Sequence, residues 1–145
     1  MGNSILYLTM TITSAAEFLE LAKQSEGTVS EEIRWGEASQ EVWLEVIALD
    51  PELKTVVLIN KRLPFGVLEV LSHDADRRVR YTVATKRKMP LHVMETLSRD
   101  SDVLVRSAIA WNGSATRQVL EQMAFDPEKE IAEKARQRLN DGEFR

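Results

Sequence analysis

The feature that most constrains this chain is an internal repeat with a period of 26 residues. Residues 64–84 align with residues 90–110 without a gap, so that Arg80 falls on Arg106, and the alignment extends over residues 33–135 with one two-residue deletion. Units of this length are typical of repeat proteins, in which each unit is one small motif that buries its apolar face only against its neighbours. The period therefore predicts a stack of similar units.

Each unit contains two short segments with the apolar spacing of a helix. Apolar residues recur at offsets of three and four, which places them on one helix face. Asp50-Pro51 and Asp126-Pro127 have the pattern of a helix N-cap followed by proline in the first turn, where the missing N–H costs nothing. The equivalent apolar positions are Leu44, Leu68, Met94 and Leu120 in the first segment, and Val57, Val83, Ile109 and Ala135 in the second.

Stacking decides the expected fold, because two such short helices cannot bury their apolar stripes alone, whereas stacked neighbours can. We predict one all-α domain over residues 1–145. Its expected parts are an N-terminal segment with a capping helix over residues 1–28, stacked repeats of 24–26 residues over residues 29–126, and a C-terminal capping helix with a tail over residues 127–145.

The repeat unit resembles that of the leucine-rich repeat variant family. It reads Asp-x-Asp-x-x-Val-Arg-x-x-Val-Ala, then a short basic or Asn-containing loop, then Pro and x-x-x-Leu-x-x-Leu, most closely at residues 74–97 and 100–123. The resemblance covers about three quarters of the chain. It implies a bacterial protein whose HEAT-like repeats of two short helices form a right-handed superhelix. The full expectation is therefore a short right-handed α-solenoid of two-helix HEAT-like repeats.

The amino-acid composition excludes several kinds of functional site. The chain has no cysteine, so it lacks disulfides, thiol nucleophiles and the cysteine motif with which some members of that family hold an iron–sulfur cluster. The two histidines, His73 and His92, occupy different positions of the repeat and are interpreted as surface residues. Ser114 is interpreted as a helix N-cap and not as a nucleophile. We therefore expect no enzyme activity, no cofactor and no metal site.

The sequence also bears on where the protein works. No apolar run approaches the ~18 residues of a membrane span. Residues 5–8 are apolar but have no basic flank, so they make a poor secretory signal. The regular pattern begins just after Met10, which is an alternative start to Met1. We expect a cytoplasmic protein with no membrane partner, monomeric when free.

Charge is unevenly distributed along the chain, whose net charge is −4. Residues 1–54 contain 10 acidic and 3 basic side chains, whereas residues 55–145 contain 13 acidic and 16 basic ones. One column of the repeat is acidic throughout: Glu45, Glu69, Glu95 and Glu121. Two interpretations stay open for it, a solvated helix face with local Arg or Lys partners and an acidic strip that receives a basic protein.

The three tryptophans occupy two different columns. Trp43 lies in an apolar column and is expected in the core. Trp35 and Trp111 share a column with Thr85, which indicates partial exposure. They are either anchors of a protein interface or residues that pack on the end of their own helix.

Basic residues concentrate in residues 61–106, which contain 10 basic and 6 acidic side chains. Arg80 and Arg106 are similar to the structural arginine of HEAT-like repeats, which bonds an aspartate or a carbonyl of the adjacent unit. The remaining cluster is a candidate nucleic-acid site, because neutralised phosphates would drive binding. The net negative charge and the scarcity of aromatic residues beside the cluster oppose this hypothesis. The cluster contains Arg77, Arg78, Lys86, Arg87 and Lys88.

The function predicted from these features is that of a non-enzymatic protein-binding repeat module. Its most specific form is an immunity (antitoxin) protein that binds and blocks a cognate bacterial toxin domain, by analogy with small standalone repeat proteins of bacteria. The acidic first half of the chain would attract a basic toxin domain. The candidate interface comprises Trp35, Trp111 and the four glutamates. The alternative is a nucleic-acid-binding HEAT-like protein that uses residues 77–88.

Overall fold

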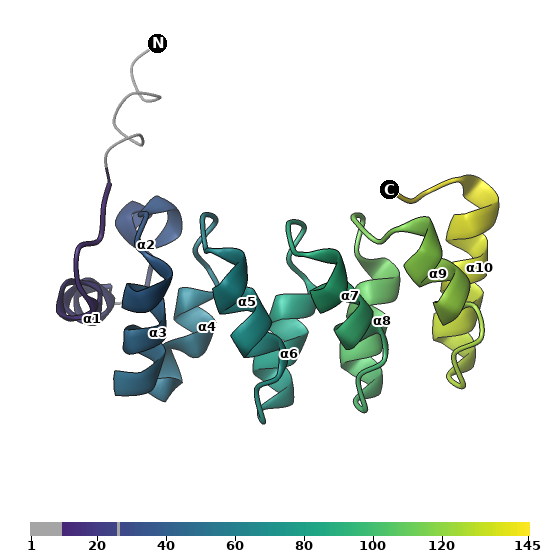
Figure 1. Cartoon of the computed structure of the whole chain (residues 1–145), viewed down its shortest axis with the longest axis horizontal. Helices are drawn as coiled ribbons and strands as arrows, with labels where there is room; N and C mark the ends of the chain where they lie inside the picture. The colour runs from purple at the N-terminus through teal and green to yellow at the C-terminus, as the bar shows by residue number, and fades with distance from the viewer. Residues whose placement is uncertain (1–9, 26) are drawn as a thin grey trace, which may run out of the picture. The chain divides into compact units, whose positions relative to one another are not determined.

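The computed structural model describes residues 10–25 and 27–145, and over these residues the protein is all α-helical (Figure 1). The only strand-like contact in this part of the chain is a single parallel bridge between Thr11 and Glu37. The prediction of an all-α protein is therefore confirmed.

The chain divides into two compact units, residues 1–67 and residues 68–145. The predicted N-terminal segment includes residues 1–9, which lie outside the described residues, and so does the choice between Met1 and Met10 as the start. The organisation as a single domain stays a prediction.

Serine caps fix where the helices of the first unit begin. The hydroxyls of Ser14, Ser30 and Ser39 each accept a backbone N–H from the first turn of the following helix, which satisfies one of its free donors. Asp50 caps the next segment in the same way, as its sequence pattern predicts. The elements are α1 (Ala15–Gln24), α2 (Glu31–Trp35), α3 (Gln40–Leu49), the 3₁₀ helix η2 (Pro51–Leu53) and α4 (Lys54–Val57), and α5 (Phe65–Ser72) begins at the end of this unit.

In the second unit, the side chains of Asp76 and Asp102 cap two helices at equivalent positions of the repeat. The prediction that Ser114 is an N-cap is wrong. Thr116 accepts the backbone N–H of Val119 at the start of the next helix, and Ser114 is buried in the turn before it. The helices are α6 (Arg77–Ala84), α7 (Leu91–Ser98), α8 (Val103–Trp111), α9 (Arg117–Met123) and α10 (Lys129–Asp141).

These helices of the second unit form two layers (Figure 1). In one layer α8 packs between α6 and α10, and in the other α7 packs beside α9. The layers meet where α7 contacts α6 and α8 and where α9 contacts α10. This packing of consecutive helix pairs is consistent with a stack of repeats.

The apolar columns supply the core of the second unit. Leu68, Met94 and Leu120 are buried at equivalent positions of the repeat. The second column is also buried, with Val83 and Ile109 fully inaccessible to solvent. The 26-residue period therefore places the core of this unit as predicted.

The first unit departs from the repeat at α3. Leu44 belongs to the same column as the buried leucines above, yet its side chain is only half-buried. The helix buries Trp43, as the other repeats bury Val93 and Val119 at the equivalent position. The Trp43 ring meets the ring of Phe18 of α1 edge-on, with 5.2 Å between the ring centres, so α3 packs against a helix that precedes the repeats.

Candidate functional site

Successive repeats of the second unit are joined by the same arginine–aspartate bond. The Arg80 guanidinium donates from Nε and Nη2 to the Asp100 carboxylate at 2.7 and 3.0 Å, and from Nη1 to the carbonyl of Asp74 at 2.8 Å. One repeat later, Arg106 donates from Nε and Nη2 to Asp126 at 2.9 and 3.3 Å. Two parallel hydrogen bonds give such a pair a fixed geometry. The prediction that Arg80 and Arg106 are structural is confirmed.

The surroundings of Asp100 keep this link charged. Only 8% of its side chain is exposed. Burial raises the pKa of Asp100, but hydrogen bonds from Arg80 and from the backbone N–H of Asp102 outweigh it, so the pKa lies below its ordinary value. The carboxylate is therefore ionised at neutral pH and holds two repeats together.

A second series of hydrogen bonds also joins the repeats, and the sequence analysis does not predict it. The buried Asn112 amide donates from Nδ2 to the carbonyls of Ala84 and Lys86, both at 2.8 Å. Twenty-six residues later, Nη1 of the buried Arg138 donates to the carbonyls of Ala110 and Asn112 at 2.9 and 2.8 Å. The acceptors lie at the carboxyl end of the equivalent helix one repeat earlier, which is α6 for Asn112 and α8 for Arg138. A helix leaves its last carbonyls without partners, and these donors satisfy them.

The first unit contains a bond of the same kind. Nδ2 of the buried Asn60 donates to the carbonyls of Ile33 and Gly36 at 2.7 and 2.8 Å. The sequence does carry a signal for this series, because four polar residues recur every 26 positions. They are Asn60, Lys86, Asn112 and Arg138.

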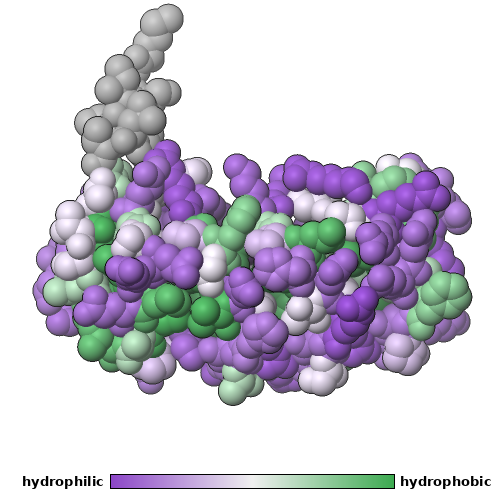
Figure 2. Space-filling view, viewed as in Figure 1, coloured by the Kyte–Doolittle hydropathy of each residue, from purple (hydrophilic) through white to green (hydrophobic). Residues whose placement is uncertain are grey.

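The predicted acidic column falls on both units. Glu45 is exposed on α3 of the first unit, and the other three glutamates lie on α5, α7 and α9. The Glu69 carboxylate is 3.3 Å from Nε2 of His92, and Nε of Arg117 donates to Glu121 at 2.8 Å. Such local partners favour the solvated-face interpretation for these two glutamates. The face of the second unit that α7 and α9 present is mainly hydrophilic (Figure 2).

The three tryptophans differ in exposure. Trp43 is fully buried, as predicted. Trp35, at the end of α2, is half-buried. Trp111, at the end of α8, is 66% exposed, and Nζ of Lys134 lies 4.0 Å from the centre of its ring. A cation is attracted to the face of an indole ring, so Lys134 orients Trp111 without covering it.

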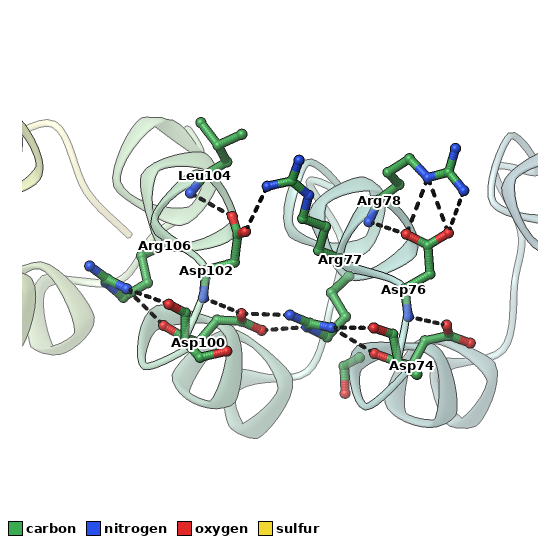
Figure 3. Close-up of polar contacts among 12 residues, drawn as sticks. Asp74, Asp76, Arg77, Arg78, Asp100, Asp102, Leu104 and Arg106 are labelled. Carbon is green, nitrogen blue, oxygen red and sulfur yellow. Dashed lines mark hydrogen bonds and ion pairs between the residues drawn. The ribbon is translucent and has the colours of Figure 1, made fainter.

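Carboxylates neutralise part of the predicted basic cluster. Nη1 of Arg77 donates to Asp102 at 3.2 Å, and Nη2 of Arg78 donates to Asp76 at 2.8 Å (Figure 3). Each of these aspartates also caps a helix. Arg77 and Arg78 therefore have less charge to offer a phosphate than their sequence suggests.

The rest of the cluster lies in the turn after α6. The Lys86 side chain is half-buried, whereas Arg87 and Lys88 are exposed. Among the described residues, neither Arg87 nor Lys88 has an ion-pair or hydrogen-bond partner for its side chain. Their two charges are available to a binding partner.

The outward face of α8 carries an apolar strip that no sequence prediction included. Leu104 is 54% exposed, although large apolar side chains at such regular spacing usually face a core. Its side chain points away from α8 in Figure 3. Contiguous apolar surface on a soluble protein marks an interaction site. The α8 strip consists of Leu104, Ser107, Ala108 and Trp111, at positions i, i+3, i+4 and i+7 of one helix face.

A hollow of about 240 Å³ lies beside the α8 strip, between α6 and α8. It is lined by Arg77, Arg78, Tyr81, Thr82, Asp102 and Leu104. Tyr81 is 45% exposed, so an aromatic ring and a leucine meet solvent together here. The sequence does carry a signal for this surface. The equivalent positions of three repeats are Arg78, Leu104 and Glu130, and only the residue in α8 is apolar.

None of the known protein-family models, curated proteins or solved structures matches the chain. The resemblance to the leucine-rich repeat variant family therefore stays a prediction. Within residues 10–25 and 27–145, no helix is long and apolar enough to cross a membrane. The same part of the chain brings no three His, Asp or Glu side chains together in a way that could hold a metal ion.

Proposed function

We propose that this protein is a short right-handed solenoid of HEAT-like two-helix repeats that works as a non-enzymatic protein-binding module. Two features support the stacked architecture. The arginine–aspartate bond recurs between equivalent residues of successive repeats, and the buried amide and guanidinium donors recur with the same period. Both series cross from one repeat to the next, so they fix the register of the stack.

The α8 strip is the observation that carries the binding function. Trp111 and Leu104 leave large apolar areas in water on a helix that both series of hydrogen bonds hold in place. Tryptophan, tyrosine and arginine dominate the binding energy of protein interfaces. The strip and the adjacent hollow bring Trp111, Tyr81 and two arginines to one face. A rigid surface of this kind binds without the cost of ordering its own side chains and loops.

The immunity protein is the narrower form of this proposal. In that form the exposed Glu69 and Glu121 and the half-buried Glu95, with the acidic first unit, would meet a basic toxin domain. Nucleic-acid binding through residues 77–88 has less support, because Arg77 and Arg78 each hold a carboxylate.

Site-directed photo-crosslinking tests the proposal. A photoreactive amino acid replaces Trp111 in one variant and Phe125 in another, and each variant is irradiated in extracts of cells that contain the natural partners. Phe125 is the matched control, because it is 86% exposed in the same unit but lies outside the α8 strip. We expect position 111 to yield a defined protein adduct that position 125 does not.

The adduct is then identified and its affinity measured with purified components. We expect Trp111→Ala to weaken the complex at least about tenfold, as truncation of an interface hot spot does, and Phe125→Ala to leave it unchanged. Equal adducts from both positions, or a complex indifferent to Trp111→Ala, would rule out the α8 strip as the binding surface.

A further inference from the structure

The two sides of the α8 strip differ in charge. On the α6 side, the outward residues of the helix include Arg77 and Arg78, and α6 itself has no acidic residue. On the α10 side, Glu130 and Glu133 are exposed at positions equivalent to Leu104 and Ser107. Lys129 pairs with Glu133 at 3.7 Å, so the acidic charge on the α10 side that has no ion-pair partner in the described residues is that of Glu130. The strip therefore has Arg77 and Arg78 on one side and Glu130 on the other.

The turn that carries the exposed Arg87 and Lys88 begins beside the carboxyl end of α8. The Asn112 side chain bonds the carbonyls of Ala84 and Lys86, so the carboxyl ends of α6 and α8 are adjacent. Trp111 precedes Asn112, and Arg87 follows Lys86. The aromatic end of the strip is therefore beside the turn that carries Arg87 and Lys88, and Nζ of Lys134 lies over its ring.

The size and shape of this surface fit a protein segment. The hollow beside Leu104 holds about 240 Å³, which is below the ~300–1,000 Å³ of small-molecule pockets. A single apolar side chain fills such a space. The strip from Leu104 to Trp111 covers two helical turns, or roughly 10 Å. Recognition of a partner helix uses apolar anchors at the same i, i+3, i+4 and i+7 spacing.

We infer that the α8 strip docks an amphipathic helix of a partner protein that carries carboxylates along the flank facing α6. This inference rests on the proposed protein-binding function and names its partner. The apolar side of that helix covers Leu104 and Trp111, and one of its side chains enters the hollow at Tyr81. Its carboxylates meet Arg87 and Lys88, and Glu130 repels carboxylates on the opposite flank.

The centre of this surface distinguishes a peptide from a nucleic acid. Single strands bind to grooves of unpaired cations and stack their bases on aromatic rings. Here Arg77 and Arg78 are held by Asp102 and Asp76, and the exposed large side chains of the strip are Leu104 and Trp111. The Lys134 ammonium group lies over one face of the Trp111 ring, 4.0 Å from its centre, where a base would have to stack. The surface therefore favours a helix with apolar anchors over a chain of phosphates.

Selection from a displayed library of helical peptides, with the full chain as bait, tests the inference. The library keeps an apolar stripe constant and randomises the flanking positions among Glu, Lys, Gln and Ser. We expect the selected peptides to be enriched in Glu on one flank. Their affinity, measured by fluorescence anisotropy of the labelled peptide, should fall about tenfold or more with Trp111→Ala and with the double change Arg87→Glu, Lys88→Glu.

Two control variants make the result specific. Phe125→Ala removes another exposed aromatic ring of the same unit, and Gln118→Lys adds a positive charge on α9, in the other layer. Both should leave the affinity of the selected peptides unchanged. Circular dichroism of every variant confirms that it is folded, so that a loss of affinity reports on the surface.

Each other outcome overturns the inference. Enrichment in Lys, binding that ignores Trp111, or failure to select any peptide would show that the strip does not take an acidic helix. Tighter binding of a labelled single-stranded oligonucleotide than of the selected peptides would assign the surface to nucleic acid. If photo-crosslinking at position 111 still captures a protein while the selected peptides are basic, the protein-binding function stands and only the partner chemistry is wrong.

Discussion

Arg80 and Asp100 lie twenty residues apart in the sequence, and two hydrogen bonds of 2.7 and 3.0 Å join their side chains across the boundary between repeats. Arg106 and Asp126 stand in the same relation one repeat later. The aspartate is buried more deeply than the arginine in both pairs. Removal of the arginine would therefore leave a buried carboxylate without its counter-charge. We therefore expect the stability of the stack to depend on these pairs.

Arg80→Met should destabilise the protein. The substitution leaves the Asp100 carboxylate without its counter-charge and removes the hydrogen bond that Arg80 donates to the Asp74 carbonyl. Loss of one partner of a buried ion pair is strongly unfavourable, and we expect a loss of about 2–3 kcal/mol in the free energy of unfolding. Urea denaturation followed by circular dichroism measures it. Arg78→Met is the matched control, because its pair with Asp76 is exposed to solvent and its loss should shift the midpoint much less. Equal midpoint shifts for the two variants would refute the structural role of Arg80.

Acid should weaken the same link. The folded-state pKa of Asp100 lies below its ordinary value of 3.8, so the unfolded chain binds a proton more readily than the folded one. The contribution of this carboxylate to stability is then complete above about pH 5, and it is lost as the pH falls through 3.8 toward the lower folded-state pKa. Unfolding free energies measured between pH 7 and pH 2 should show a shallower acid decline in Asp100→Asn than in the unaltered protein. An identical decline in both would contradict this assignment.

Asn112 should contribute to stability through the hydrogen bonds that its amide donates and not through the volume of its side chain. Asn112→Ala leaves the carbonyls of Ala84 and Lys86 without the amide that satisfies them, at a cost of about 2 kcal/mol. Asn112→Asp keeps the shape but cannot donate, and it places a negative charge against two carbonyl oxygens. We expect thermal melts to rank Asn112→Asp at or below Asn112→Ala in stability. If Asn112→Asp melts at the same temperature as the unaltered protein, the hydrogen bonds contribute nothing to stability.

Much of this architecture follows from the 26-residue period alone. Once Val83 and Ile109 are aligned, both must face the same layer boundary, and both are fully buried. Arg80 and Arg106 are foreseeable for the same reason, since a charged residue repeated beside a core column needs a repeated partner. The α3 helix is less predictable, because Leu44 is only half-buried there and Trp43 packs against Phe18 of α1. That contact lies outside the repeat, so no column of the alignment contains it.

The binding surface is harder to foresee than the core. A leucine at helical spacing is indistinguishable in sequence from a core residue, and only the packing of α8 between its neighbours shows that Leu104 faces water. The sequence singles out Trp111 through its column with Thr85, but not the strip to which it belongs. The role of Asn112 is hidden for another reason. Its partners are backbone carbonyls, which every residue possesses, so the sequence does not identify them.

The exposure of Trp111 can be checked without any knowledge of a partner. An exposed indole emits at longer wavelengths and is quenched by acrylamide, whereas a fully buried one such as Trp43 is protected. Trp111→Phe should therefore shift the emission maximum to shorter wavelengths and lower the quenching constant several-fold, with Trp35 leaving an intermediate remainder because it is half-buried. Trp43→Phe should shift the emission maximum to longer wavelengths and raise the average quenching constant, since it removes the protected residue. Quenching that persists unchanged in Trp111→Phe would show that the ring is covered, and the α8 strip would then lose its aromatic anchor.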